Sequence, residues 1–411
     1  MNQENTSAPA ENKMGTMPIG KLLFNMSLPM MISMLVQALY NIVDSIFVAK
    51  LSENALTAVS LAFPLQTLLI AVGTGTGVGM NALLSKSLGE KNFKKANATA
   101  SNAAVLYFFS YLVFFILGFT IVRPFYASQI GNADQEIMEL GIEYLSTVMI
   151  FSFGLLAQVF FERLLTSTGR TIFSMTSQLT GAITNIILDP ILIFGLLGAP
   201  KMGVTGAAVA TVIGQCVAAL VAGFCNHRYN HDVKLKFHGF RLDFHIIGTI
   251  YAVGIPSALM ISISSILTIA LNSVLVKFSN TAVSIYGIYY RLQTFITMPV
   301  NGLVQGVRPI IGFNYGAKDR GRIFETLKIS LIVSGVLMLI GLLLFMFIPR
   351  QLLSMFNASE NMMNLGIQTL RIMSLGFLFS AISFIISAMY ESIGKGTYSL
   401  AISLVRQCII I

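Results

Sequence analysis

Long apolar stretches alternate with short polar connections along almost the whole chain. Stretches of spanning length, about 20 residues or more, lie at 22–48, 55–84, 98–122, 141–162, 171–196 and 203–225, and again at 245–276, 282–307, 324–348, 364–390 and 397–411. The pattern predicts an all-α polytopic membrane protein with ten full spans and part of an eleventh. Composition agrees, because 55% of the residues are hydrophobic and only 10% are charged, whereas soluble domains carry about 25% charged residues.

The two halves of the chain repeat each other. Leu28-Pro29 matches Ile255-Pro256 at an offset of 227, and Ser167-Thr168-Gly169-Arg170 matches Ser392-Ile393-Gly394-Lys395 at an offset of 225. An even number of spans in each repeat makes the repeats parallel, as in transporters built from two lobes with substrate between them. In this register Ile411 corresponds to Ile186, in the middle of the fifth helix. We therefore expect two parallel six-helix repeats, a twelve-helix fold, with the last one to two helices missing.

Basic residues set the expected orientation and domain limits. Connections on the side of the N-terminus hold 18 Lys and Arg residues and those on the opposite side hold five, which places the N-terminus in the cytoplasm and the protein in the cell membrane. The net charge of +9 then reflects topology, and no nucleic-acid partner is expected. The expected parts are a cytoplasmic tail (1–21), an N-lobe of helices 1–6 (22–225), a basic cytoplasmic linker (226–244) and a C-lobe of helices 7–11 (245–411).

Asp44 and Asp189 lie well inside apolar stretches, and no Lys or Arg of the same half is placed to neutralise them. A carboxylate at mid-bilayer costs about 3 kcal/mol on insertion scales, so such residues are functional candidates. They would take up protons or bind a small cation, as a cation-coupled transporter requires. The alternative is a pair of structural hydrogen bonds between helices, with both acids permanently neutral.

Several motifs resemble the multidrug and toxic compound extrusion (MATE) family of cation-coupled efflux transporters. They cover nearly the whole chain and include Ser27-Leu28-Pro29, Tyr40-Asn41-Ile42-Val43-Asp44, Gly73-Thr74-Gly75-Thr76-Gly77, Asn185-Ile186-Ile187-Leu188-Asp189-Pro190 and Gly206-Ala207-Ala208-Val209-Ala210-Thr211. The resemblance implies a twelve-helix fold and export of lipophilic, often cationic small molecules. It also implies a proton or Na⁺ site in the N-lobe formed by Asp44, Asn185, Asp189 and Thr211, with Asp44 and Asp189 as the Na⁺ ligands. No other cofactor is expected.

Helix geometry favours the same site. Asn185 and Asp189 are four residues apart and share a helix face. Asp44, Asp189 and Thr211 lie four to eight residues from the outer ends of their spans, roughly 6 to 12 Å deep. Pro190 cannot donate to the carbonyl four residues before it, and Pro29 leaves the carbonyl of Asn25 free in the same way. We expect Pro29 to let helix 1 bend when the two acids are protonated or bind a cation.

The C-lobe departs from the family pattern, since helix 7 has no acidic residue and Glu391 lies near the cytoplasmic end of helix 10. Arg291 either bonds backbone carbonyls or tunes the central cavity. Glu162 is expected to be an interfacial charge paired with Arg163 or a neighbouring loop. The glycines between 73 and 79 indicate close helix packing rather than a phosphate loop, because no strand precedes them and no Gly-Lys-Ser/Thr follows. The remaining candidates for the substrate cavity are Gln37, Tyr40, Asn41, Met260 and Met298.

The leading hypothesis is a monomeric antiporter that exchanges protons or Na⁺ for lipophilic, often cationic small molecules by alternating access of its two lobes. The first alternative is a lipid-linked oligosaccharide flippase of related architecture, which would need several cationic residues in its cavity for pyrophosphate. The second alternative is an inactive truncated fragment of such a transporter. An enzyme is not expected, because the sequence has no Asp-rich metal motif, no His-Glu-x-x-His and no nucleophile constellation.

Overall fold

The computed structural model describes residues 12–130, 135–235, 242–356 and 360–407, and over these residues every regular element is a helix. The helices are α1 (Lys13–Thr16), α2 (Ile19–Ala49), α3 (Glu53–Gly89), α4 (Phe93–Thr120), α5 (Val122–Ile130), α6 (Gln135–Ile150), α7 (Phe153–Ser167), α8 (Thr171–Phe194), η1 (Leu196–Gly198), α9 (Gly203–Tyr229), α10 (Phe244–Leu275), α11 (Asn280–Gly316), α12 (Arg320–Phe347), α13 (Pro349–Ser354), α14 (Glu360–Ser374), α15 (Gly376–Ser392) and α16 (Gly396–Val405). The expected all-α membrane fold is confirmed.

Fewer spans pass a test of length and composition than the apolar pattern predicts. Among the described residues, eight helices are long and apolar enough to cross a membrane, or nine if the bent pair α6–α7 counts as one span. The predicted span 141–162 is this pair, whose two helices meet at an angle of 43°. The predicted span 282–307 lies within α11, a 37-residue helix that is not among the eight. Its polar face accounts for the difference, since that face lines the cavities described below.

The internal repeat is visible in the backbone itself. Helices α3 and α11 begin and end 227 residues apart, as do α4 and α12. The turns after them repeat as well, because Lys91 and Lys318 have φ of 55° and 61°. At the later offset of 225, Gly169 and Gly394 both take left-handed φ, 82° and 86°, which glycine tolerates without strain. The two halves therefore share one fold.

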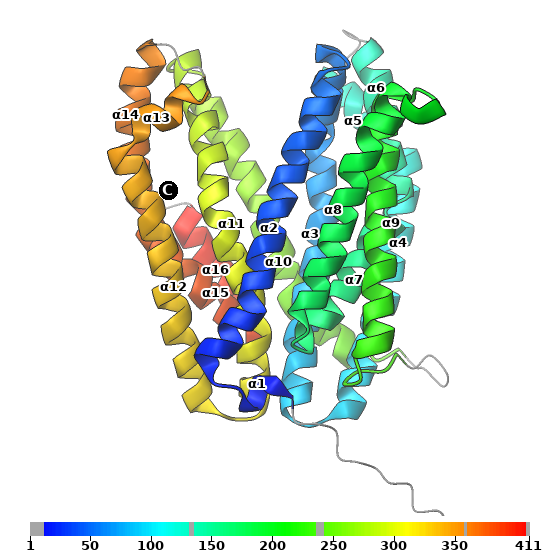
Figure 1. Cartoon of the computed structure of the whole chain (residues 1–411), viewed down its shortest axis with the longest axis vertical. Helices are drawn as coiled ribbons and strands as arrows, with labels where there is room; N and C mark the ends of the chain where they lie inside the picture. Colours follow the sequence, from blue (N-terminus) through cyan, green and yellow to red (C-terminus); the bar gives the residue numbers. More distant parts are fainter. Residues whose placement is uncertain (1–11, 131–134, 236–241, 357–359, 408–411) are drawn as a thin grey trace, which may run out of the picture.

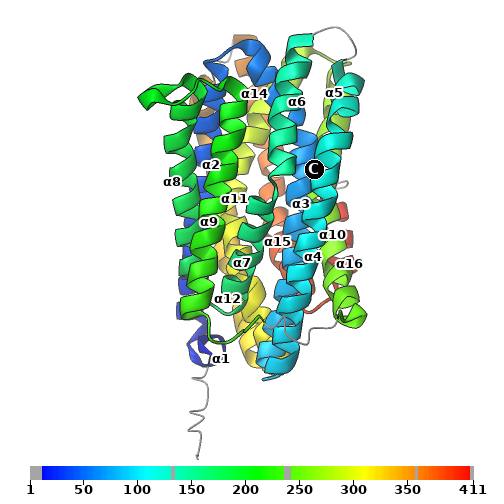
Figure 2. The same ribbon diagram turned by 90° about the vertical axis from the view of Figure 1, so that its right-hand side faces the viewer.

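We call α2 to α9 the N-lobe and α10 to α16 the C-lobe. The two lobes lie close together at the end that carries α1, and their helices diverge toward the opposite end (Figure 1). Helix α2 packs against α8 of its own lobe and α11 of the other, while α10 packs against α16 and α3 in the same way. Figure 2 faces the N-lobe and shows α8 and α9 side by side along their length. Helices α2 and α10 therefore join the lobes.

Glycines allow these lobe contacts to be close. A Cβ added at Gly79 on α3 would lie 2.0 Å from the carbonyl oxygen of Ile250 on α10. A Cβ at Gly306 of α11, the repeat equivalent of Gly79, would lie 2.3 Å from the Ser27 hydroxyl oxygen on α2. No side chain fits at such distances. The prediction that the glycines of this segment serve close helix packing is confirmed for Gly79.

Residues 13–21, assigned from the sequence to a tail, contain α1 and the start of α2. Met14 of α1 is fully buried, and its carbonyl accepts a hydrogen bond of 3.0 Å from the Arg322 guanidinium in the C-lobe. On the other side, the Asn12 amide donates to the Thr168 carbonyl in the N-lobe, at 3.4 Å. This segment therefore bridges the lobes at their closed end.

Candidate cation and cargo site

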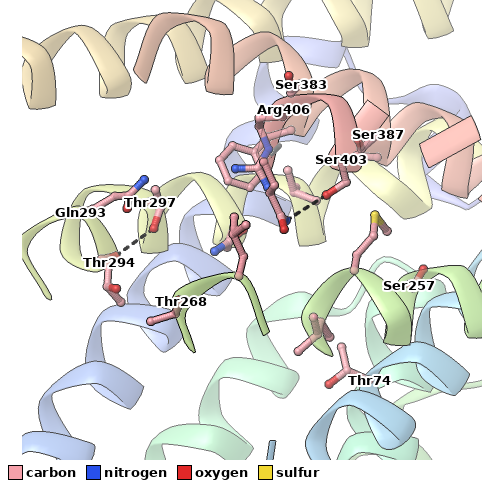
Figure 3. A pocket seen from close by; sticks show the side chains of 18 of the residues that line it. Thr74, Ser257, Thr268, Gln293, Thr294, Thr297, Ser383, Ser387, Ser403 and Arg406 are labelled. Atoms are coloured by element: carbon pink, nitrogen blue, oxygen red, sulfur yellow. Dashed lines mark hydrogen bonds between the residues drawn. The ribbon is translucent and has the colours of Figure 1, made fainter. Parts of the chain in front are cut away.

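Two adjoining cavities lie between the lobes. The N-lobe cavity has a volume of about 420 Å³ and is lined by α2, α3, α7, α8, α9, α10 and α11. The C-lobe cavity, of about 460 Å³, is lined by α3, α10, α11, α15 and α16. Figure 3 shows its polar lining, including Ser257, Thr297 and Ser403. The cavities share Thr74 and Arg308 among their lining residues, so a ligand in either one contacts both lobes.

The predicted cation-site residues lie together beside the N-lobe cavity. The Asn185 amide donates to Asp189 Oδ1 at 3.2 Å and to Thr211 Oγ1 at 3.3 Å. Asp189 is fully buried and Asn185 is 3% exposed. The half-buried Asp44 of α2 places its carboxyl beside that of Asp189. Three helices thus bring these four side chains to one point.

The local sequence explains why the site residues of α8 and α9 lie within hydrogen-bonding distance. Gly181 of α8 faces Gly214 of α9, and a Cβ at either would lie within 2.9 Å of the other's carbonyl oxygen. Because the helices approach so closely, Thr211, three residues before Gly214, reaches Asn185, four residues after Gly181. The polar residues of this α8 face follow the helical repeat and so point the same way.

Several oxygens of this group lack a hydrogen-bond partner in the described part of the chain, namely Asp44 Oδ1, Asp189 Oδ2 and Asn185 Oδ1. An ionised carboxylate only accepts hydrogen bonds, so two neighbouring carboxylates repel each other unless a proton or a cation lies between them. Carboxylate, amide and hydroxyl oxygens are the ligands that hard cations prefer. The donor set therefore fits either a shared proton or a small hard cation such as Na⁺.

The two prolines lie inside continuous helices, Pro29 in α2 and Pro190 in α8. Pro29 frees the carbonyl of Asn25, as expected, and this oxygen accepts a hydrogen bond of 3.2 Å from the Thr171 hydroxyl at the start of α8. A side chain of a neighbouring helix thus replaces the bond that Pro29 cannot make.

The candidate cavity residues divide into two groups. Gln37 and Tyr40 line the N-lobe cavity and Met260 lines the C-lobe cavity. The others, Asn41, Arg291 and Met298, line neither of these cavities. Asn41 follows Tyr40 by one residue, which turns its side chain about 100° away. Arg291 is exposed, and its neighbours Tyr290 and Gln293 line the C-lobe cavity.

Sequence reasoning missed two acids that the fold buries at the cavities. Glu162 is 7% exposed and lines the N-lobe cavity, so its assignment as an interfacial charge is wrong. Its carboxylate accepts hydrogen bonds from Gln158, Ser177 and Gln178, at 2.9, 3.2 and 2.8 Å. The available signal was the Gln158–Glu162 pair, an amide and an acid four residues apart within an apolar stretch.

Glu391, 1% exposed, lines the C-lobe cavity. It forms an ion pair of 2.7 Å with Arg308 and accepts a hydrogen bond of 2.9 Å from Ser257. Arg163 of the same half also lines the N-lobe cavity. Its guanidinium donates to Gln305, and no ion pair of the described residues joins it to Asp44 or Asp189. Position along a span did not reveal these groups, because the cavities are lined by residues near the C-terminal ends of α7 and α15.

Comparisons with known proteins agree with this architecture. The chain is 29% identical over 402 residues to "Multidrug export protein MepA" of Staphylococcus haemolyticus (strain JCSC1435), which covers 96% of this chain and 86% of that protein. The crystal structure of a MATE protein in the straight conformation matches with a TM-score of 0.90 and 25% identity, covering 97% of this chain and 88% of the other. The bent conformation matches with a TM-score of 0.87 and 26% identity, covering 95% and 86%.

The family match is itself duplicated. Residues 29–191 and 256–411 each match the family described as MatE, and the two matches begin 227 residues apart, the offset found within the sequence. Together they span well over half of the chain. The chain therefore belongs to the MatE family of membrane transporters.

Proposed function

We propose that this protein is a secondary active multidrug efflux transporter of the cell membrane. It exchanges protons or Na⁺ for lipophilic, often cationic small molecules. The proposal rests mainly on one observation. Asp44, Asn185, Asp189 and Thr211 lie together beside a cavity between the lobes, and three of their buried oxygens have no hydrogen-bond partner in the described part of the chain. Relatives called multidrug export proteins match almost the whole chain, which supports drug-like cargo.

The coupling step follows from where Asp44 lies. Its helix, α2, contacts both α8 and α11, so it belongs to the packing of both lobes. A proton or cation between Asp44 and Asp189 removes their mutual repulsion and draws α2 toward α8. Its release reverses this and shifts α2 against α11, which changes the relative position of the lobes. Pro29 lowers the cost of bending α2 in this step, because one backbone hydrogen bond is already absent.

The orientation belongs to the same proposal. The N-terminus and the closed end face the cytoplasm, and the lobes open toward the outside. The acting unit is a monomer, since both cavities and the cation site are formed within one chain.

Ethidium efflux from energised cells tests the proposal. The chain is compared with its Asp44→Asn and Asp189→Asn variants, with an empty vector, and with Glu90→Gln, which makes the same carboxyl-to-amide change at a solvent-exposed pair. Efflux that both aspartate variants abolish and Glu90→Gln retains supports the coupling site. Equal efflux from all variants would remove Asp44 and Asp189 from the mechanism. Imposed proton or Na⁺ gradients in proteoliposomes then identify the ion.

A second candidate function has one observation in its favour. Arg163 and Arg308 line the N-lobe cavity, and cavity cations are what a flippase of lipid-linked oligosaccharides would need for pyrophosphate. Glu162 and Asn185 line the same cavity, and Asp189 lies behind Asn185, bonded to its amide. The negative charge of the two acids disfavours a dianionic group. The multidrug proposal therefore stands first. Pyrophosphate-lipid flipping by the purified protein, without ethidium transport, would reverse this order.

A further inference from the structure

The floor of the N-lobe cavity carries positive charge from both lobes. Arg163 comes from α7 and Arg308 from α11, and the two guanidinium groups are electrostatic neighbours. Arg308 has a carboxylate partner, Glu391, at 2.7 Å. Arg163 instead donates to the neutral amide oxygen of Gln305, at 3.1 Å. Among the ion pairs of the described residues, none involves Arg163.

Glu162, the next residue along the chain, forms no direct ion pair with Arg163 among the described residues. Its carboxylate oxygens are held by the amides of Gln158 and Gln178 and by the Ser177 hydroxyl, all of them neutral donors. Adjacent residues of a helix point to different sides, so Glu162 faces α8 while Arg163 crosses to α11. The cavity therefore holds a negative and a positive charge that are not paired with each other.

Such an arrangement is costly without a ligand. Arg163 is half-buried, and a guanidinium with reduced access to water is stabilised by an anion or by several acceptors. It has five N–H donors, of which Gln305 takes one. The nearby Arg308 adds repulsion in a medium that screens charge poorly. An anion placed beside Arg163 and Gln305 would relieve both effects and would contact the N-lobe and the C-lobe at once.

We propose that the floor of the N-lobe cavity, formed by Arg163, Gln305 and Arg308, binds the carboxylate of zwitterionic cargo. The cationic part of the same molecule then lies toward Glu162 and the cation site. The inference rests on the proposed transport function and extends it from cationic molecules to molecules that carry both charges. A carboxylate is favoured over a phosphate group because it matches the planar guanidinium fork with a single charge, whereas the acids of the cavity repel a second one.

A matched pair of dyes tests this proposal. Rhodamine 110 is a zwitterion with a free carboxylate, and rhodamine 123 is its methyl ester and a cation. Binding of both to the purified full chain in detergent is measured by fluorescence polarisation, and the readout is the ratio of their affinities. Replacing a charge-assisted hydrogen bond changes affinity by about tenfold or more. Arg163→Gln should therefore lower the rhodamine 110 to rhodamine 123 affinity ratio by at least about tenfold.

A second variant separates this role from folding. Gln305→Glu keeps the shape of the side chain and places a carboxylate beside Arg163, so that the protein supplies the anion itself. It should also lower the ratio by about tenfold or more, with rhodamine 123 bound at normal stoichiometry. The control is Arg123→Gln, an exposed arginine outside the cavities, which should leave the ratio unchanged.

The outcomes are distinct. The proposal is overturned if neither Arg163→Gln nor Gln305→Glu changes the affinity ratio. It is also overturned if the wild-type protein binds rhodamine 123 but not rhodamine 110. Displacement of rhodamine 110 by inorganic pyrophosphate but not by benzoate would assign the site to a phosphate group and overturn the carboxylate. Ethidium efflux is scored separately, so the transport function survives a negative result here. Failure of both dyes to bind removes the cavity as a cargo site.

Discussion

The hydrogen bond between Thr171 and Asn25 connects a sequence feature, Pro29, to the packing of α2 on α8. Pro29 has no N–H, so the Asn25 carbonyl lacks its helical donor, and the Thr171 hydroxyl donates to it at 3.2 Å. Thr171 is fully buried at the start of α8. We predict that Thr171→Val, which keeps the branched shape but removes the hydroxyl, destabilises the protein.

The expected loss of stability follows from the loss of one neutral hydrogen bond at a buried site, where no water replaces the missing donor. A typical bond contributes about 1 kcal/mol, and a buried acceptor left without a donor costs about 1–3 kcal/mol. We therefore expect a loss of about 1–2 kcal/mol. A chain of this size unfolds with a large entropy, so the apparent Tm should fall by only about 1–3 °C.

The decisive measurement is a double-mutant cycle in detergent, read by the thermal unfolding midpoint. Pro29→Ala restores an N–H at position 29, which can donate to the Asn25 carbonyl within α2. In that background Thr171→Val should lose less stability than in the wild type, by at least about 0.5 kcal/mol. Equal losses in both backgrounds would refute the reasoning, because the Thr171 hydroxyl would then not be compensating for the proline.

Other predictions concern helix packing and charged side-chain pairs. Gly79→Ala should strongly lower expression and thermal stability, because its Cβ would lie 2.0 Å from a carbonyl oxygen of α10. Gly20→Ala, whose Cβ would have no atom within 4 Å, should leave both unchanged. Size-exclusion chromatography in detergent after heating measures both variants. Glu391→Gln should cost about 1–3 kcal/mol by leaving the half-buried Arg308 without its charged partner, seen as a lower Tm. The matched change Glu90→Gln, in an exposed pair at 3.8 Å, should cost less than about 1 kcal/mol.

Much of the fold could be predicted, because membrane-spanning helices need long apolar stretches and a duplicated fold repeats its motifs at a fixed offset in the sequence. Apolar length located the helices, and the offsets of 227 and 225 match the spacing of equivalent helix ends and turns. The bend between α6 and α7 could not be predicted in this way. No proline marks it, since residues 150–153 are Ile, Phe, Ser and Phe, and an apolar run has the same composition whether straight or bent.

The candidate site was predictable where its residues lie on one helix or at a similar depth in the membrane. The pair Asn185 and Asp189 follows from a four-residue spacing, and the structure places Thr211 and Asp44 beside them. The floor of the cavity was not predictable, because Arg163 and Gln305 meet across the lobe interface, 142 residues apart. Nothing in the local sequence of either helix indicates that contact. The internal repeat does not indicate it either, since Gln305 corresponds to Val78 in the first half.

In the proposed mechanism, Asn185 connects the cation site to the cargo cavity. It lines the N-lobe cavity, and its amide bonds to both Asp189 and Thr211. A proton or cation on Asp189 weakens the carboxylate as an acceptor and frees the Asn185 amide for a ligand in the cavity. A ligand that takes that amide leaves Asp189 with one donor fewer and a greater need for a cation. Because such coupling is reciprocal, the proposed mechanism predicts that a bound ion changes cargo affinity by the same factor as bound cargo changes the affinity for the ion.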